Sequence, residues 1–196
     1  IPGRHNVMNA LAAATVAMRY GMAPETVARI LASQHTISPH RMALSTVNRE
    51  GTSFTLIDDS FNANPDSMKA GLNGLKAWNS NDGKEPFRVA LLGAMLELGA
   101  DETALHTSIG TYADELGIDA IIAVGSAQDQ HLDALAQALA DGARQSQSAS
   151  VDCVHDIDAA EQLVIDLARN HPDAVVLLKG SHASGLSALA ERWAKN

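Results

Sequence analysis

The sequence predicts an α/β fold, in which helices cover both faces of a doubly wound, mostly parallel sheet of six strands. Short apolar runs alternate with helical stretches from residue 42 to the C-terminus. The runs are almost continuously apolar, as strands of a parallel sheet are when both faces are buried. Hydrophobic residues make up 46% of the chain and charged residues 19%, close to the globular average, so a packed core is expected.

Two amphipathic helices are expected before the sheet. Apolar residues recur at three- and four-residue steps from His5 to Tyr20. A second helix is expected over residues 24–33, because Pro24 suits the first helical turn. Two helices alone do not form a domain, and the sequence opens without an initiator Met. We therefore expect residues 1–37 to be the end of a preceding domain, and residues 38–196 to form the α/β domain.

The strands and helices of this domain follow one another in regular alternation. Strands are expected over residues 42–47, 54–57, 89–92, 120–124, 151–154 and 174–178. Helices are expected over residues 65–78, 103–116, 127–139, 157–169 and 183–193. Only residues 48–53, including Gly51, separate the first two strands, so these should form a hairpin and give the sheet one antiparallel edge.

Charge and composition exclude several classes of protein. The net charge of −9 argues against a nucleic-acid partner, since phosphate binding to a duplex needs clustered Lys and Arg. No segment reaches the roughly 18 consecutive apolar residues of a membrane span. A single cysteine, Cys153, cannot form an internal disulfide and is expected to pack as a small apolar residue within a strand. We expect a cytoplasmic protein.

Ligands of open α/β sheets bind beyond the carboxyl ends of the strands. Five polar or glycine-rich stretches begin where a predicted strand ends, and all should therefore face one edge of the sheet. They occupy residues 58–65, 93–99, 125–126, 155–156 and 179–182.

The stretch over residues 58–65 carries the most information. Asn64, Pro65 and Asp66 have the form of a helix start, as an N-cap, a first helical residue and an acidic residue near the positive end of the helix dipole. A turn does not require the carboxylate of Asp59 or the amide of Asn62. A carboxylate here could bind ribose hydroxyls, and this interpretation is favoured for Asp59. For the two asparagines, structural and binding roles stay open.

Other candidates have structural alternatives. Lys179, Gly180 and Ser181 could bring a cation, a close backbone and a hydroxyl to a ligand, or could simply form a strand-to-helix turn capped by Ser181. Asn6 and Asn9 lie on one helix face at a spacing of three, more than a helix cap requires. His106 is interpreted as a packed or surface residue rather than a catalyst. The sequence contains no G-x-x-x-x-G-K-[ST] loop, no G-x-G-x-x-G after a strand, and no evident set of metal ligands.

Taken together and in order, the motifs resemble those of the Mur ligases, of the MurF type, and the resemblance runs nearly end to end. The D-D-S-F-N-A-N-P run is the most specific of them. The motifs are Gly3-Arg4-His5-Asn6 with Asn9, Pro39-His40-Arg41, Asp58 to Pro65, Leu92 to Gly99, and Lys179-Gly180-Ser181.

The resemblance implies a function for the whole enzyme. Such ligases use ATP to join D-alanyl-D-alanine to UDP-N-acetylmuramoyl-tripeptide in bacterial cell-wall synthesis. Residues 1–37 would close the central ATPase domain, whose earlier part carries the phosphate loop and most Mg²⁺ ligands, and residues 38–196 would form the Rossmann-like C-terminal domain. The mechanism implied is activation of the tripeptide carboxylate to an acyl phosphate, followed by attack of the dipeptide amine. A monomer is expected, inactive without the preceding domain.

The resemblance also assigns roles to individual residues. Asn6 and Asn9 would contact adenine and Asp59 the ribose. Arg41, the one residue assigned a catalytic role, would reach the nucleotide phosphates when the domains close. The substrate-binding residues on the side of the incoming dipeptide would be Asn62, Asn64, Lys179 and Ser181.

Two positions depart from the family pattern. Ala94 stands where an Asp is usual, and His182 where an Arg is usual, which replaces a permanent cation by one that titrates near neutrality. Two alternatives stay open. One, favoured by these two departures, is a related ligase that takes another amine. The other, favoured by the absence of a G-x-x-x-x-G-K-[ST] loop, is a non-catalytic module that binds a nucleotide or a peptide.

Overall fold

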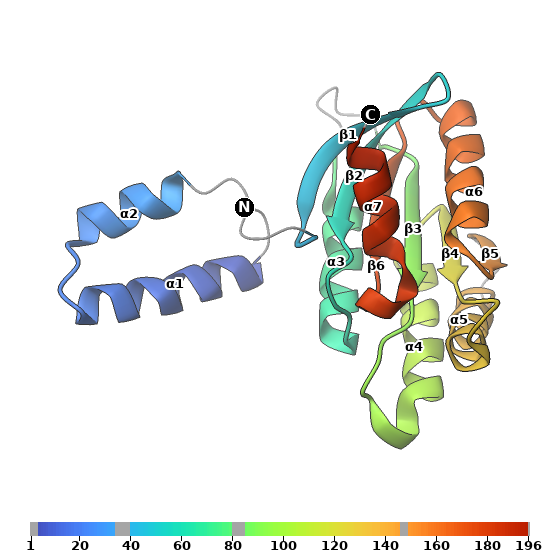
Figure 1. Ribbon diagram of the computed structural model, residues 1–196, viewed down its shortest axis with the longest axis horizontal. Helices are drawn as coiled ribbons and strands as arrows, with labels where there is room; N and C mark the ends of the chain where they lie inside the picture. The colour runs from blue at the N-terminus through green and yellow to red at the C-terminus, as the bar shows by residue number, and fades with distance from the viewer. Residues whose placement is uncertain (1–3, 34–39, 80–84, 146–148, 196) are drawn as a thin grey trace.

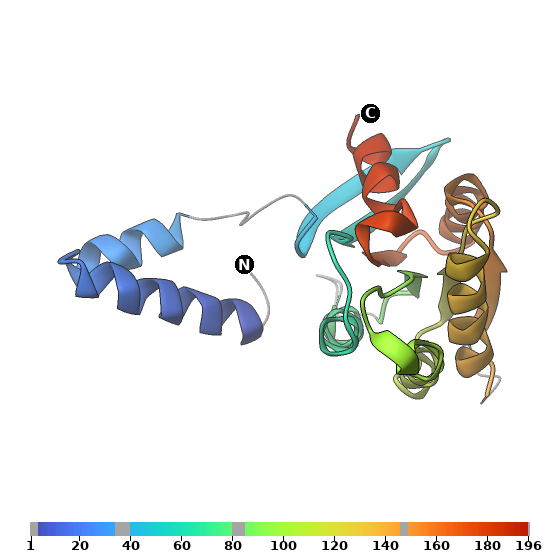
Figure 2. The same ribbon diagram turned by 60° about the horizontal axis from the view of Figure 1, so that its bottom comes forward.

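A computed structural model describes residues 4–33, 40–79, 85–145 and 149–195. The chain begins with two helices, α1 (Arg4–Arg19) and α2 (Pro24–Ala32), which pack on each other and stand apart from the α/β body in both views (Figures 1 and 2). Both predicted helices are confirmed, including Pro24 in the first turn. The expected domain boundary at residues 37 and 38 lies outside the described residues and stays a prediction.

Six strands form one sheet in the order β1-β2-β6-β3-β4-β5. The predicted α/β fold and its mostly parallel sheet are thereby confirmed. The first pair, β1 (Ala43–Arg49) and β2 (Thr52–Asp59), is an antiparallel hairpin, and every other neighbouring pair is parallel. The remaining strands are β3 (Arg88–Gly93), β4 (Ala120–Val124), β5 (Ser150–Val154) and β6 (Val175–Lys179).

Helices cover the sheet in two layers, visible in Figures 1 and 2. One face packs against α3 (Pro65–Ala77), α4 (Glu102–Glu115) and α5 (Gln130–Ala143), and the other against α6 (Ile157–Asn170) and α7 (Leu186–Ala194). Short 3₁₀ turns over Gly99–Asp101 and His182–Ser184 precede α4 and α7. Every residue of β3, β4 and β6 is buried, as their continuous apolar runs predict.

The fifth helix differs most from its predicted bounds. It begins at Gln130 rather than residue 127, because the Asp129 carboxylate caps it by accepting hydrogen bonds from two backbone N–H groups. It also continues to Ala143, because its last turn is buried against α4. A Cβ at Gly110 of α4 would overlap the backbone carbonyl oxygen of Leu139, so the two helices touch backbone to backbone.

The topology creates a crevice beside β6. The carboxyl ends of the five parallel strands lie on one edge of the sheet, as predicted. Strand β2 leads into α3 on one face, whereas β6, its neighbour, leads into α7 on the other. Where the connections after two adjacent strands run to opposite faces of the sheet, a gap is left between them, and ligands of such sheets bind there. The carboxyl ends of β2 and β6 thus mark the candidate site.

Candidate functional site

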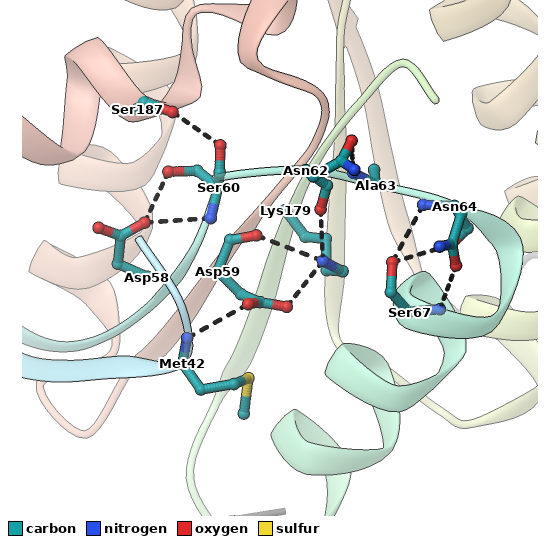
Figure 3. A network of polar contacts seen from close by, with 10 residues as sticks. All are labelled: Met42, Asp58, Asp59, Ser60, Asn62, Ala63, Asn64, Ser67, Lys179 and Ser187. Carbon is teal, nitrogen blue, oxygen red and sulfur yellow. Dashed lines mark hydrogen bonds and ion pairs between the residues drawn. The ribbon is translucent and has the colours of Figure 1, made fainter. Parts of the chain in front are cut away.

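The last residues of β2 and β6 form a buried ion pair. Asp59 and Lys179 are register partners in the parallel ladder, and the Lys179 ammonium lies 2.7 Å from Oδ2 of Asp59. The same ammonium donates to the backbone carbonyls of Asn62, at 2.9 Å, and of Asp59, at 3.3 Å (Figure 3). Because an ammonium has three protons, these contacts use them all. Lys179 therefore holds the turn that follows β2 against the end of β6.

The Asp59 carboxylate is held on its second side as well. Its Oδ1 accepts a hydrogen bond of 3.2 Å from the backbone N–H of Met42, just before β1. The side chain keeps 17% of its surface exposed, against 2% for Lys179. A carboxylate oxygen can accept more than one hydrogen bond, so Asp59 can still receive hydroxyl donors from a ligand.

Asp58 points to the other side of the sheet and serves the structure. Its Oδ1 accepts hydrogen bonds from the Ser60 N–H, at 3.2 Å, and the Ser60 hydroxyl, at 2.6 Å. Its Oδ2 lies 2.8 Å from Nδ1 of His40, whose Nε2 is 3.6 Å from Glu191 of α7. The Ser187 hydroxyl donates to the Ser60 carbonyl and ties this turn to α7 (Figure 3). Asp58 thus anchors the residue that precedes Arg41.

The two asparagines of the turn have visible structural roles. Asn64 is the N-cap of α3, where its Oδ1 accepts from the Ser67 N–H at 2.8 Å and the Ser67 hydroxyl receives the Asn64 N–H at 3.0 Å. The predicted helix start is confirmed as a capping box. Asn62 accepts a hydrogen bond from the N–H of Ala63 at 2.8 Å. Both asparagines remain exposed to solvent.

A hollow of about 350 Å³ opens over this turn. Its wall includes Arg41, Asp59, Phe61, Asn62, Asn64 and Lys179. The Arg41 guanidinium lies 4.3 Å from the centroid of the Phe61 ring, a cation–π contact that orients the cation at the hollow. Sequence reasoning missed Phe61, although a phenylalanine inside the polar run that follows β2 was a usable signal.

The other predicted site residues lie elsewhere. Ser181 is buried; its N–H donates to the Ala94 carbonyl at 2.9 Å, and its hydroxyl neither caps the following 3₁₀ turn nor finds a partner among the described residues. It does not line the hollow. Asn6 and Asn9 both belong to α1; Asn9 is exposed, and the side chain of Asn6 lies outside the described residues.

The wall of the hollow fits part of a nucleotide site. Arg41 offers a permanent cation and Asp59 an accessible acceptor, which suit a phosphate and ribose hydroxyls respectively. Within residues 4–33, 40–79, 85–145 and 149–195, no three His, Cys, Asp or Glu side chains gather closely enough to hold a metal ion. Across the same residues, no helix is long and apolar enough to cross a membrane.

Cys153 is not an activated nucleophile. Burial, followed by the nearby Asp133 carboxylate, raises the pKa of its thiol, and the side chain packs beside the core. The prediction that it packs as an apolar residue is in keeping with this environment, although the side chain is only partly buried.

Comparison with known proteins identifies the family. Residues 40–182 match the family model described as "Mur ligase, glutamate ligase domain". The chain belongs to the Mur ligase family. The MurF-type resemblance is confirmed by relatives such as the UDP-N-acetylmuramoyl-tripeptide–D-alanyl-D-alanine ligase of Mycobacterium tuberculosis strain CDC 1551, 39% identical over 96% of this chain and 38% of its own length. The ligase of that name from Escherichia coli K12 is 34% identical over 64% of this chain and 25% of its own length.

The fold agrees with solved Mur ligase structures. A MurF crystal structure from Acinetobacter baumannii superposes with a TM-score of 0.78 at 26% identity, over all of this chain and 39% of that one. The chain therefore spans less than two fifths of the length of such relatives.

The two departures from the family pattern lie in different environments. Ala94 is buried in an apolar cluster with Leu132 and Leu135, so a carboxylate there would need a polar partner that this cluster does not supply. His182 is exposed on the turn after β6.

Proposed function

We propose that this chain is the C-terminal part of an ATP-dependent amide ligase that adds D-Ala-D-Ala to UDP-N-acetylmuramoyl-tripeptide in peptidoglycan synthesis. Residues 1–37 would close the central ATPase domain, and residues 38–196 would be the C-terminal domain. The observation that carries the proposal is the placement of an accessible Asp59 and of Arg41 around one hollow at the crevice between β2 and β6.

Each residue would act through the contacts described above. Asp59 would accept the ribose hydroxyls, since Lys179 and the Met42 N–H fix its carboxylate without covering it. Arg41, which its contact with Phe61 orients, would meet the nucleotide phosphates and stabilise charge on the transferred phosphoryl group. ATP, with Mg²⁺ bound mainly by the preceding domain, would supply the phosphoryl group that activates the tripeptide carboxylate as an acyl phosphate.

The remaining predicted residues would act less directly. Lys179 would bind substrate only through the turn that it holds, because its three protons are already donated within the protein. Asn62 and Asn64 would face the dipeptide from the wall of the hollow. Asn6 and Asn9 would contact the adenine from α1. No nucleophilic side chain is needed, because catalysis would rest on holding two anionic substrates and an amine in line.

The test uses the natural polypeptide that contains these 196 residues. We expect ADP release that requires both D-Ala-D-Ala and the UDP-tripeptide. Arg41→Ala should lower kcat/KM by about 10²–10³-fold, the usual effect of removing one group that stabilises the transition state. Arg144→Ala is the matched control, because Arg144 is an exposed arginine that pairs with Asp141 and does not line the hollow. ADP release that ignores the dipeptide would refute the substrate assignment.

Two alternatives predict other results. If the chain is a self-sufficient nucleotide-binding module, calorimetry on the 196-residue chain alone would give tight ATP binding. If another amine is the substrate, competition among amines in the complete enzyme would favour it over D-Ala-D-Ala. A monomeric state and a cytoplasmic location remain predictions.

A further inference from the structure

A buried histidine lies beneath the loop that leaves β3. The loop over residues 94–98 joins β3 to the 3₁₀ turn before α4, and it starts on the same edge of the sheet as the candidate site. His106, on the first half of α4, is fully buried. The hollow does not include it, so the proposed function leaves this histidine without a role.

The hydrogen bonds of His106 determine which ring nitrogen carries the proton. The backbone N–H of Met95 donates to Nε2 at 2.8 Å. A backbone N–H can only donate, so Nε2 must be unprotonated. The proton of the neutral ring therefore sits on Nδ1, which lies 2.6 Å from the carbonyl oxygen of Glu102 and donates to it. A protonated ring would have no acceptor to offer Met95.

The surroundings favour the neutral ring. Burial is the largest influence and lowers the pKa of His106 below its ordinary value of 6.5. Among the residues that the structure describes, the titratable groups that act on this ring are Glu102 on its own helix and His131 on α5. Nε2 of His131 lies 3.3 Å from Oε1 of Glu102. The carbonyl and carboxylate of Glu102 oppose the effect of burial, but burial prevails.

The loop that His106 holds is bonded in turn to the end of β6. The Ala94 carbonyl accepts the N–H of Ser181 at 2.9 Å, and the Ser184 hydroxyl donates to the Ser181 carbonyl at 2.6 Å. The backbones nearly touch here, since a Cβ at Gly180 would lie 3.0 Å from the Cα of Gly93. Hydrogen bonds thus run from α4 through the loop to the turn that follows Lys179.

We propose that His106 is a positioning residue, whose neutral ring holds the loop over residues 94–98 and, through it, the turn over residues 179–181. Its importance for the reaction rests on the proposed function, together with the role on the dipeptide side that the family resemblance implies for Ser181. The positioning itself does not rest on the proposed function, and it can be tested on this chain without measuring the reaction.

The first measurement is nitrogen NMR of the His106 ring in the 196-residue chain. We expect a neutral ring at pH 7 with its proton on Nδ1. We also expect the amide signals of Met95 and Ser181 to move on acidification with the same midpoint as the ring. A proton on Nε2, or a Ser181 amide that ignores the ring, overturns the proposal even if every variant fails to fold.

The second measurement is amide hydrogen exchange in two variants. His106→Leu fills the same buried position with an apolar side chain that has no acceptor, so exchange at Met95 and Ser181 should rise about tenfold relative to amides of α6. His106→Gln carries an amide oxygen that can replace Nε2 and should restore most of the protection. The matched control is His155→Gln, an exposed histidine on the same edge. Equal exchange in wild type and His106→Leu, or failure of Gln to restore protection that Leu removes, overturns the proposal.

In the complete enzyme, His106→Leu should raise KM for the dipeptide more than it lowers kcat. If the NMR expectations hold and no ligase activity exists, the proposed function fails while the positioning stands.

Discussion

Replacing Lys179 by Met should destabilise the α/β body by about 3 kcal/mol. The substitution keeps an unbranched side chain as long as the lysine stem but removes one partner of a buried ion pair, a change that typically costs about 3–5 kcal/mol. We expect the lower end, because Asp59 retains 17% exposure and water can partly solvate its carboxylate. The carbonyl oxygens of Asp59 and Asn62 also lose their shared donor.

A double-mutant cycle separates the ion pair from the packing of the lysine stem. Asp59→Asn alone should cost about 2 kcal/mol, since it leaves a buried cation with only neutral acceptors. Adding Lys179→Met to Asp59→Asn should cost much less than it does in wild type, which gives a coupling energy of at least about 1.5 kcal/mol. The exposed Lys69, replaced by Met, is the control and should change stability by less than about 0.5 kcal/mol.

Urea unfolding monitored by the fluorescence of the buried Trp193 measures these energies. The native state of a domain of this size is stable by about 5–15 kcal/mol, so each variant should remain folded in water. A loss below about 1 kcal/mol for Lys179→Met, or a coupling energy near zero, would refute the conclusion that this pair fastens β2 to β6.

Three further predictions use the same unfolding assay. Gly110→Ala should cost at least about 2 kcal/mol, because its Cβ would overlap the Leu139 carbonyl, whereas Gly74→Ala should be nearly neutral or stabilising; equal effects would contradict the close helix contact. Burial raises the pKa of Glu161, but hydrogen bonds from two arginines and a tryptophan outweigh it and lower that pKa. Glu161→Gln should therefore cost about 2–3 kcal/mol at pH 7, and the difference should shrink as the pH falls below 4.5. The folded state lowers the pKa of His106 below 6.5, so the unfolded chain takes up this proton at a higher pH than the folded chain does. Below pH 6.5 the free energy of unfolding of wild type should therefore fall faster than that of His106→Gln, by up to about 1.4 kcal/mol per pH unit. Parallel plots of unfolding free energy against pH for the two proteins would contradict this.

The class of fold was predictable because periodicity reports it directly. Buried parallel strands are apolar throughout, and β3, β4 and β6 satisfy that pattern at every apolar position. The order of the strands was not predictable, because no local signal tells β6 to enter the sheet between β2 and β3. Asp59 and Lys179 can touch because β6 lies next to β2, which makes the two residues register partners.

The candidate site shows the same division between local and distant information. The start of α3 was predictable, because capping chemistry is confined to Asn64 and the next few residues. The different roles of Asp58 and Asp59 were not predictable from the sequence. Consecutive residues of a strand point to opposite faces, so one carboxylate had to face α7 and the other the hollow. Leu56 packs in the core on the α7 side of the sheet and Ile57 in the core on the α3 side, and this packing determines that Asp58 faces α7 and Asp59 faces the hollow.

The turn after β6 is held from two independent directions, and this explains why its residues gave an ambiguous signal in the sequence. On one side, Lys179 is bonded to the turn after β2. On the other side, Ser181 is bonded to the loop that His106 holds. Each of these bonds joins segments far apart in the chain, so Lys179, Ser181 and His106 each look ordinary when taken alone. Their arrangement holds the turn over residues 179–181 between the loop that follows β2 and the loop that follows β3.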